Sequence, residues 1–169
     1  MKKTDEKYQA YIQILKEELV PAMGCTEPIA LAYAGAKARE VLGCVPDKVL
    51  VEASGSIIKN VKSVIVPNTN HLKGIPAAVT AGIIAGKAEK ELEVIAEVTP
   101  DEIEQMITFL KETPITVEHI DQGITFDIVL TLYKEDSYAK VRIANYHTNI
   151  VHIEKDGEVL YESGVVASS

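Results

Sequence analysis

Apolar residues in the first part of the chain recur at close to a 3.6-residue spacing, which predicts amphipathic helices. Residues 5–20 follow this period, and Pro21 ends the predicted helix. A second helix is predicted from about 27 to 42, with Thr26 as its N-cap and Gly43 at its end. Because this second segment is apolar on nearly every side, we expect the helix to be buried.

Two further helices are predicted in the middle of the chain. Residues 74–87 are rich in alanine, glycine and isoleucine and predict another buried helix with Pro76 in its first turn. Small side chains dominate both buried helices and permit close helix–helix approach. Residues 99–112 carry a helix start signal, with Thr99 as N-cap and acidic residues in the first turn.

The segments between these helices are less regular. Residues 48–53 are rich in valine and predict a strand. Residues 54–60 and 64–70 combine small and amide side chains with little periodicity, so we interpret them mostly as loop with short extended pieces.

After Pro114 the pattern changes to one that is typical of strands. The predicted strands are 115–120, 125–133, 138–144, 150–154 and 158–162. Hairpin turns are expected at 135–137 and at 155–157, the latter with an Asp-Gly pair, which predicts an antiparallel meander. Helices first and strands later predict an α+β fold, with helices packed on one face of a mostly antiparallel sheet. We expect a single domain over 1–164, and a frayed tail or truncated linker over 165–169.

Composition narrows the classes of function. The chain has 169 residues, 47% hydrophobic, with a net charge of −8, and its isoelectric point is near 5.0. An acidic chain without a basic stripe argues against nucleic-acid binding and favours a small-molecule ligand or a protein partner. No secretory signal and no membrane-spanning run is visible, which predicts a cytoplasmic protein without membrane contact.

Cys25 is the residue most suited to chemistry. It lies directly before the helix predicted from 27, where unpaired N–H groups and the helix dipole favour a thiolate that can bind metal or attack a substrate. Cys44 follows a helix end and is interpreted as a small, partly buried side chain without a chemical role. Two cysteines give no disulfide framework.

Three polar segments, 54–60, 67–71 and 145–149, lie between the periodic segments, and we expect them to converge on the same cleft as Cys25. The segment 145–149 interrupts two strands and contains no glycine, unlike a plain hairpin. The alternative interpretation is a polar turn in which Asn and Thr side chains bond their own backbone. His119 and His152 lie in strand patterns and are expected to be partly buried and hydrogen-bonded.

Three segments in the same order carry a resemblance to a known family. The first is Glu18 to Ala32, which includes Met23-Gly24-Cys25-Thr26-Glu27-Pro28. The second consists of Lys59-Asn60 followed by Val66-Pro67 and Gly74 to Ala78, and the third is His147 to Glu154. Together they resemble the iron–sulfur L-cysteine desulfidases, relatives of the L-serine dehydratase alpha chain, and the chain looks like the N-terminal portion of such an enzyme. The resemblance implies a [4Fe–4S] cluster held by three cysteines, one corresponding to Cys25 and two in the C-terminal portion.

The resemblance implies a lyase that converts L-cysteine to sulfide, ammonia and pyruvate. Asn60, Thr69, Thr148 and Asn149 are candidates for binding the amino acid, and His147 is the candidate base. We expect no cluster bound to this chain alone and no activity without the C-terminal portion or a separately encoded second chain. A homo-oligomer is also compatible with the sequence.

Three alternatives remain open at the level of the sequence. The chain is compatible with a non-catalytic amino-acid-binding or regulatory module, and with an L-serine dehydratase-like lyase. The third alternative is a Cys25 nucleophile activated by His147, as in hydrolase or redox chemistry.

Overall fold

The structure is a computed structural model, and it describes residues 26–61, 66, 72–88, 94–95, 98–145 and 149–163. The helix predicted over 5–20 and the tail over 165–169 lie outside the described residues. Among the helices of the described residues, none has both the length and the apolar character needed to cross a membrane.

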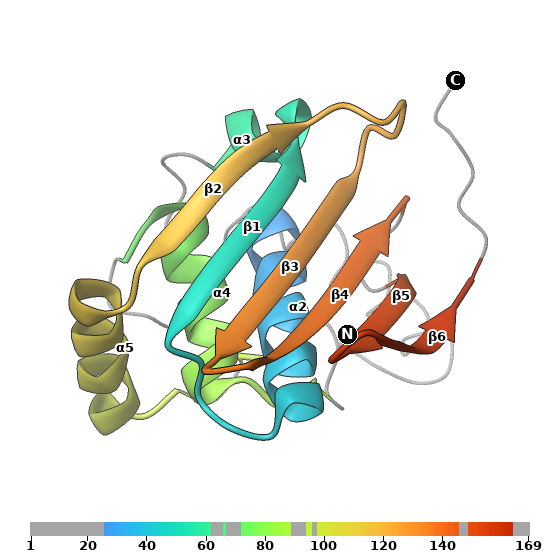
Figure 1. The fold of residues 1–169 in the computed structure, drawn as a ribbon. Coiled ribbons are helices and arrows are strands. Elements are labelled where there is room, and N and C mark those ends of the chain that lie inside the picture. The colour runs from blue at the N-terminus through green and yellow to red at the C-terminus, as the bar shows by residue number, and fades with distance from the viewer. Residues whose placement is uncertain are drawn as a thin grey trace, which may run out of the picture.

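A six-stranded sheet with the order β2-β1-β3-β4-β5-β6 forms the centre of the fold (Figure 1). Every neighbouring pair is antiparallel except β1 and β2, which run parallel. The strands are β1 (Lys48–Ser54), β2 (Ile115–Ile120), β3 (Asp127–Lys134), β4 (Ser137–Ala144), β5 (Ile150–Lys155) and β6 (Glu158–Glu162). The predicted strands are thus confirmed, and so is the α+β class with its C-terminal meander.

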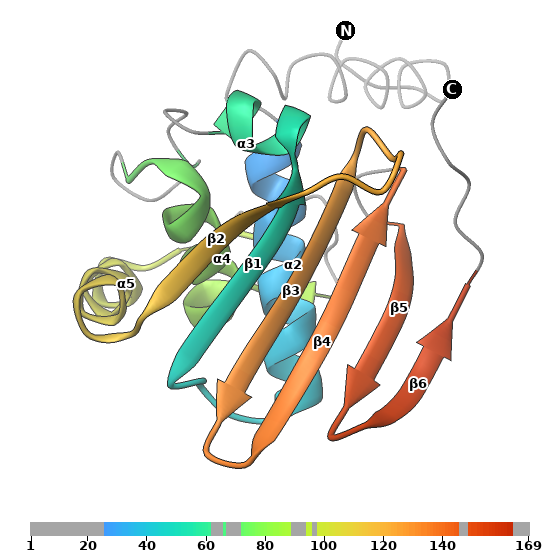
Figure 2. The same ribbon diagram turned by 45° about the horizontal axis from the view of Figure 1, so that its top comes forward.

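Two long helices lie on one face of the sheet, as Figures 1 and 2 show. They are α2 (Thr26–Leu42) and α4 (Gly74–Ala85). A short helix, α3 (Gly55–Val61), follows the end of β1, and α5 (Pro100–Glu112) lies beside α4. The core lies between α2, α4 and the sheet, because alternate residues of β1, β3 and β4 point toward the helices. Those residues are fully buried, for example Val51, Leu130 and Val141.

Small residues let α2 and α4 approach each other closely, as the sequence indicates. A Cβ atom at Gly35 of α2 would lie 2.6 Å from the carbonyl oxygen of Val79. A Cβ atom at Gly82 of α4 would lie 1.8 Å from the carbonyl oxygen of Ala32. Both distances are shorter than real contacts allow, so glycine is required where the two helices cross.

The helix ends follow the local sequence. Gly43 has φ +89° and its N–H donates to the carbonyl oxygen of Arg39 at 2.8 Å, which ends α2 in the left-handed conformation. At the start of α5 the hydroxyl of Thr99 accepts from the N–H of Glu102, and the Glu102 carboxylate accepts from the N–H of Thr99. This reciprocal pair is a capping box, and it confirms the predicted helix start.

Two expectations for secondary structure were wrong. Residues 55–61, interpreted as mostly loop, form helix α3, because Ile57 and Val61 lie one turn apart and are both buried against the core. The strand at 115–120 does not join the meander but pairs parallel with β1, with α3, α4 and α5 forming the crossover between them. Local sequence carries no signal for either outcome, since both depend on packing.

Candidate functional site

Of the polar residues predicted to bind a ligand, the structure describes Asn60 and Asn149, and both lie toward one end of the sheet. Strands β1, β2 and β4 finish at this end, and helix α2 begins there (Figures 1 and 2). Helix α2 starts here at Thr26, and Cys25, the preceding residue in the sequence, lies outside the described residues. The positive end of the α2 dipole therefore belongs to this end of the sheet.

Asn60 is the predicted binding residue that the structure brings beside the start of α2. Its amide nitrogen Nδ2 donates to Glu27 Oε2 at 3.4 Å, an exposed contact between α3 and the first turn of α2. The folding of 55–61 as a helix places the amide here, 33 residues away along the chain. The sequence predicts Asn60 as a binding residue without indicating a partner for it, and it predicts Glu27 only as a residue of the first helical turn.

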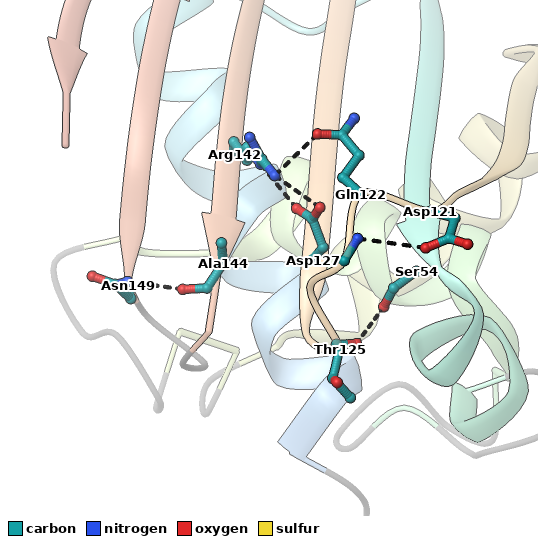
Figure 3. Close-up of polar contacts among 9 residues, drawn as sticks. Ser54, Asp121, Gln122, Thr125, Asp127, Arg142, Ala144 and Asn149 are labelled. Carbon is teal, nitrogen blue, oxygen red and sulfur yellow. Dashed lines mark hydrogen bonds and ion pairs between the residues drawn. The ribbon is translucent and has the colours of Figure 1, made fainter. Parts of the chain in front are cut away.

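The serines of the same segment have a different role. Ser54 Oγ and Ser56 Oγ both donate to the carbonyl oxygen of Thr125, at 2.6 and 3.2 Å. Figure 3 shows the Ser54 contact, which ties the end of β1 to the turn before β3. These hydroxyls hold the backbone of the site in place.

The segment between β4 and β5 is partly described. Asn145 has φ +74°, a conformation that is uncommon outside glycine and that clusters at functional sites. Its N–H donates to the carbonyl oxygen of Phe126 at 2.8 Å. Asn149 Nδ2 donates to the carbonyl oxygen of Ala144 at 2.8 Å, so this side chain bonds nearby backbone as a polar turn would (Figure 3).

A buried ion pair lies at the same end, on the face of the sheet away from α2. Asp127 is 1% exposed, and both of its carboxylate oxygens accept from Arg142, each at 2.9 Å (Figure 3). Gln122 Oε1 accepts a further hydrogen bond from Arg142 at 3.4 Å. This pair could not be predicted from the sequence, because two residues fifteen apart in an alternating pattern give no sign that they meet on neighbouring strands.

A second polar network lies farther along this face, on β4, β5 and β6. His152 contacts Glu154 through Nε2 at 2.9 Å and Glu162 through Nδ1 at 2.5 Å, and the Tyr138 hydroxyl donates to Glu154. Burial alone would lower the pKa of His152, but hydrogen bonds to the two carboxylates outweigh it and raise that pKa. Hydrogen bonds from Tyr138 and His152 lower the pKa of Glu154.

The network confirms the expectation that His152 is partly buried and hydrogen-bonded. His119 was expected to resemble it, but it is exposed at the end of β2, beside Gly55. This expectation was wrong because β2 is an edge strand, and its last residues are not covered by a neighbour on both sides.

Four of the predicted site residues lie outside the described residues: Cys25, Thr69, His147 and Thr148. Their convergence on one cleft therefore stays a prediction. Within the part of the chain that the structure describes, no group of three or more His, Cys, Asp or Glu side chains is placed to hold a metal ion. Cys44 is half-buried and packs against the core, as predicted.

The fold is therefore an α+β fold, and the polar end of its sheet is a candidate ligand-binding site. The chain is similar to the UPF0597 protein of Desulfitobacterium hafniense strain Y51, with 62% identity over 164 residues, covering 97% of this chain and 38% of that protein. It is 43% identical to the UPF0597 protein of Treponema denticola, over 92% of this chain and 36% of that one. The UPF0597 protein of Lachnoclostridium phytofermentans is 46% identical over 94% of this chain and 38% of its own length.

The chain therefore spans less than two fifths of the length of these curated relatives. No protein-family profile matches the chain. No solved structure matches it either.

These relatives correct the family assignment. The resemblance to iron–sulfur L-cysteine desulfidases was wrong as an assignment, because relatives at up to 62% identity over most of the chain carry the name of a distinct family, UPF0597. That name states neither an iron–sulfur cluster nor a desulfidase.

Proposed function

We propose that this chain is one portion of a longer protein of the UPF0597 type, and that its polar end contributes to a centre that binds a small amino acid. The observation that carries the proposal is the contact between Asn60 and Glu27 in the first turn of α2, and Glu27 is two positions after Cys25 in the sequence. An amide and a carboxylate from two distant parts of the sequence thereby meet at one end of the fold. For the complete protein we propose a lyase reaction, with L-cysteine as the first substrate to test and L-serine as the second.

The chemistry of these groups suits an amino acid. The Glu27 carboxylate can accept hydrogen bonds from an ammonium group, and the Asn60 amide can donate to a carboxylate. The N-terminal end of α2 favours a negative charge, which is supplied by the carboxylate of the ligand. An elimination also needs a base at the α-carbon and a group that stabilises the leaving thiolate or hydroxide. His147 remains the candidate base.

A [4Fe–4S] cluster does not fit the described residues as a complete ligand set, because no three suitable side chains lie together among them. We therefore derive no step through a cluster. Cys25 would supply one thiolate, and a cluster in the complete protein would need its other ligands from the portion that this chain does not match.

Turnover is tested with two proteins in parallel, this chain and the full-length Desulfitobacterium relative, after anaerobic reconstitution with iron and sulfide. Pyruvate, ammonia and, with L-cysteine, sulfide are measured. We expect no product from the chain alone and product from the longer protein. Turnover by the 169 residues alone would show that the centre is complete within them and would contradict the proposal.

Ligand binding is tested on this chain by titrating L-serine and L-cysteine while recording amide chemical shifts. We expect the largest shifts at Glu27 and Asn60, and binding at least ~10-fold weaker in Asn60→Ala, the loss of about one hydrogen bond to a charged group. The matched control is Gln105→Ala, which removes an exposed amide from α5, away from this end of the sheet. An equal loss of binding affinity in both variants would show that Asn60 does not contact the ligand. Binding without turnover in the longer protein would favour the non-catalytic amino-acid-binding module.

A further inference from the structure

Strand β6 forms one edge of the sheet, and it is more exposed to solvent than β2, the strand at the opposite edge. All five of its residues are exposed, and its centre is three consecutive apolar side chains: Val159 at 52%, Leu160 at 52% and Tyr161 at 48%. Figure 2 shows β6 at the outer edge of the sheet, next to β5. Within the described residues, no strand pairs with its outer side.

The opposite edge, β2, provides the comparison. Its residues alternate between half-buried and exposed, so that Ile115 and Val117 are partly covered while Thr116 and Glu118 face solvent. This is the ordinary pattern of an edge strand with one covered face. Edge strands that end at solvent usually carry charges or proline, because their unpaired N–H and C=O groups otherwise attract another strand.

β6 lacks such protection at its centre. Its charged residues, Glu158 and Glu162, stand at its two ends, and it contains neither lysine nor proline. Successive side chains of a strand point to opposite faces, and the register pairs Tyr161 with Ile153 and Val159 with Glu154. Ile153 packs against the core, so Tyr161 lies on the helix side and Val159 on the opposite side. Apolar surface is therefore exposed on both faces of β6 as well as along its edge.

We propose that β6 is the strand to which the remaining portion of the longer protein docks, by adding an extended segment to its free edge. This rests on the proposal that the chain works as part of a longer protein. The relatives extend beyond the matched region by more than three fifths of their length, so a partner of sufficient size is part of the same polypeptide in them. Strand addition supplies backbone hydrogen bonds along the edge and side-chain packing on both faces.

The chemistry of β6 specifies the docking segment. It is an extended stretch with apolar residues at its centre, opposite Val159 to Tyr161. Its ends carry lysine or arginine, because Glu158 and Glu162 bracket the apolar centre. A second copy of this chain would place the same glutamates near each other, so it is the less favourable occupant.

Amide hydrogen exchange tests the docking. Exchange is compared between this chain alone and the full-length Desulfitobacterium relative, at the positions that align with β6 and with β2. We expect the β6 amides to exchange at least ~10-fold more slowly in the longer protein, while β2 amides exchange at similar rates in both. Similar exchange of β6 in both proteins would overturn the proposal.

Sedimentation of this chain tests whether a second copy of the chain occupies the free edge of β6 instead. We expect a monomer whose sedimentation is unchanged by Leu160→Lys on β6 or by the control Thr116→Lys on β2. A dimer that Leu160→Lys abolishes and Thr116→Lys preserves would show that a second copy occupies the edge, and would overturn the proposal. Neither measurement depends on catalysis. If the β6 amides exchange slowly in a longer protein that shows no turnover, the docking of β6 is supported and only the proposed reaction is contradicted.

Discussion

Gly82 of α4 lies so close to Ala32 of α2 that a Cβ atom at position 82 would stand 1.8 Å from the Ala32 carbonyl oxygen. Both partners are backbone, so neither can rotate away as a side chain would. The position of α4 against α2, and through it the core of the fold, therefore depends on the absence of one methyl group.

Replacing Gly82 by alanine should separate the two helices. We expect Gly82→Ala to lower the free energy of unfolding by about 3 kcal/mol or more, at the upper end of overpacking effects. The measurement is urea denaturation followed by circular dichroism. The control is Gly55→Ala, where the added Cβ would meet only the ring of exposed His119, at 3.2 Å. A small effect of Gly82→Ala, comparable with that of the control, would show that α4 can shift without loss.

The capping box of α5 should contribute measurably to stability. Thr99→Ala removes the hydroxyl that accepts from the Glu102 N–H, and we expect a loss of about 1 kcal/mol in the free energy of unfolding. Thr99→Ser keeps an acceptor and should retain most of this energy. Denaturation of the three proteins in parallel provides the measurement. Equal stability of the alanine and serine variants would mean that the cap contributes little.

Removing only one partner of the ion pair between Asp127 and Arg142 should lower the free energy of unfolding. Arg142→Met leaves the Asp127 carboxylate buried without its cation, and we expect destabilisation of about 3 kcal/mol. Adding Asp127→Asn removes the uncompensated charge and should restore a large part of that loss. A double-mutant cycle measured by denaturation separates the two effects. Additive losses in the double variant would show that the two residues do not stabilise each other.

Stability should depend on pH through His152. Its folded pKa is raised above the ordinary value of 6.5, so its contribution is fully present below that value and is lost as the pH rises through the folded pKa. The groups facing it are Glu154, Glu162 on β6, and Arg142 on β4, whose guanidinium is paired with Asp127. We expect His152→Gln to destabilise the protein more at about pH 5.5 than at about pH 9.

The same network gives an opposite dependence through Glu154. The lowered pKa of this carboxyl means that its contribution is present above the ordinary value of 4.5 and is lost as the pH falls through the folded pKa. Denaturation of the wild type, His152→Gln and the control His119→Gln across this range provides the measurement. If His119→Gln shows the same pH-dependent difference as His152→Gln, the effect does not arise from the network on β5 and β6.

Local sequence was sufficient for most of the secondary structure, because the signals concerned are short-range. The apolar run of α4, the threonine and glutamate of the α5 cap, and the Asp156-Gly157 turn are signals that act over only a few neighbouring residues. Both turn residues have positive φ, 52° and 87°, as a two-residue hairpin loop requires. Clustering of helices before strands also identified the α+β class, since it follows from the order of elements alone.

What required the tertiary structure was the pairing of residues that are distant in the chain. The sequence marked Asn60 as polar, but only the packing of Ile57 and Val61 turns its segment into a helix and brings it to Glu27. Strands β2 and β6 are both predicted from their sequences as strands, yet β2 lies parallel beside β1 and is half-covered, while β6 is exposed on both faces. The sequence by itself determined which elements form, because propensity, period and capping are local. Their neighbours were decided by the burial of shared apolar surface and by ion pairs such as Asp127 with Arg142, which exist only after distant strands have met.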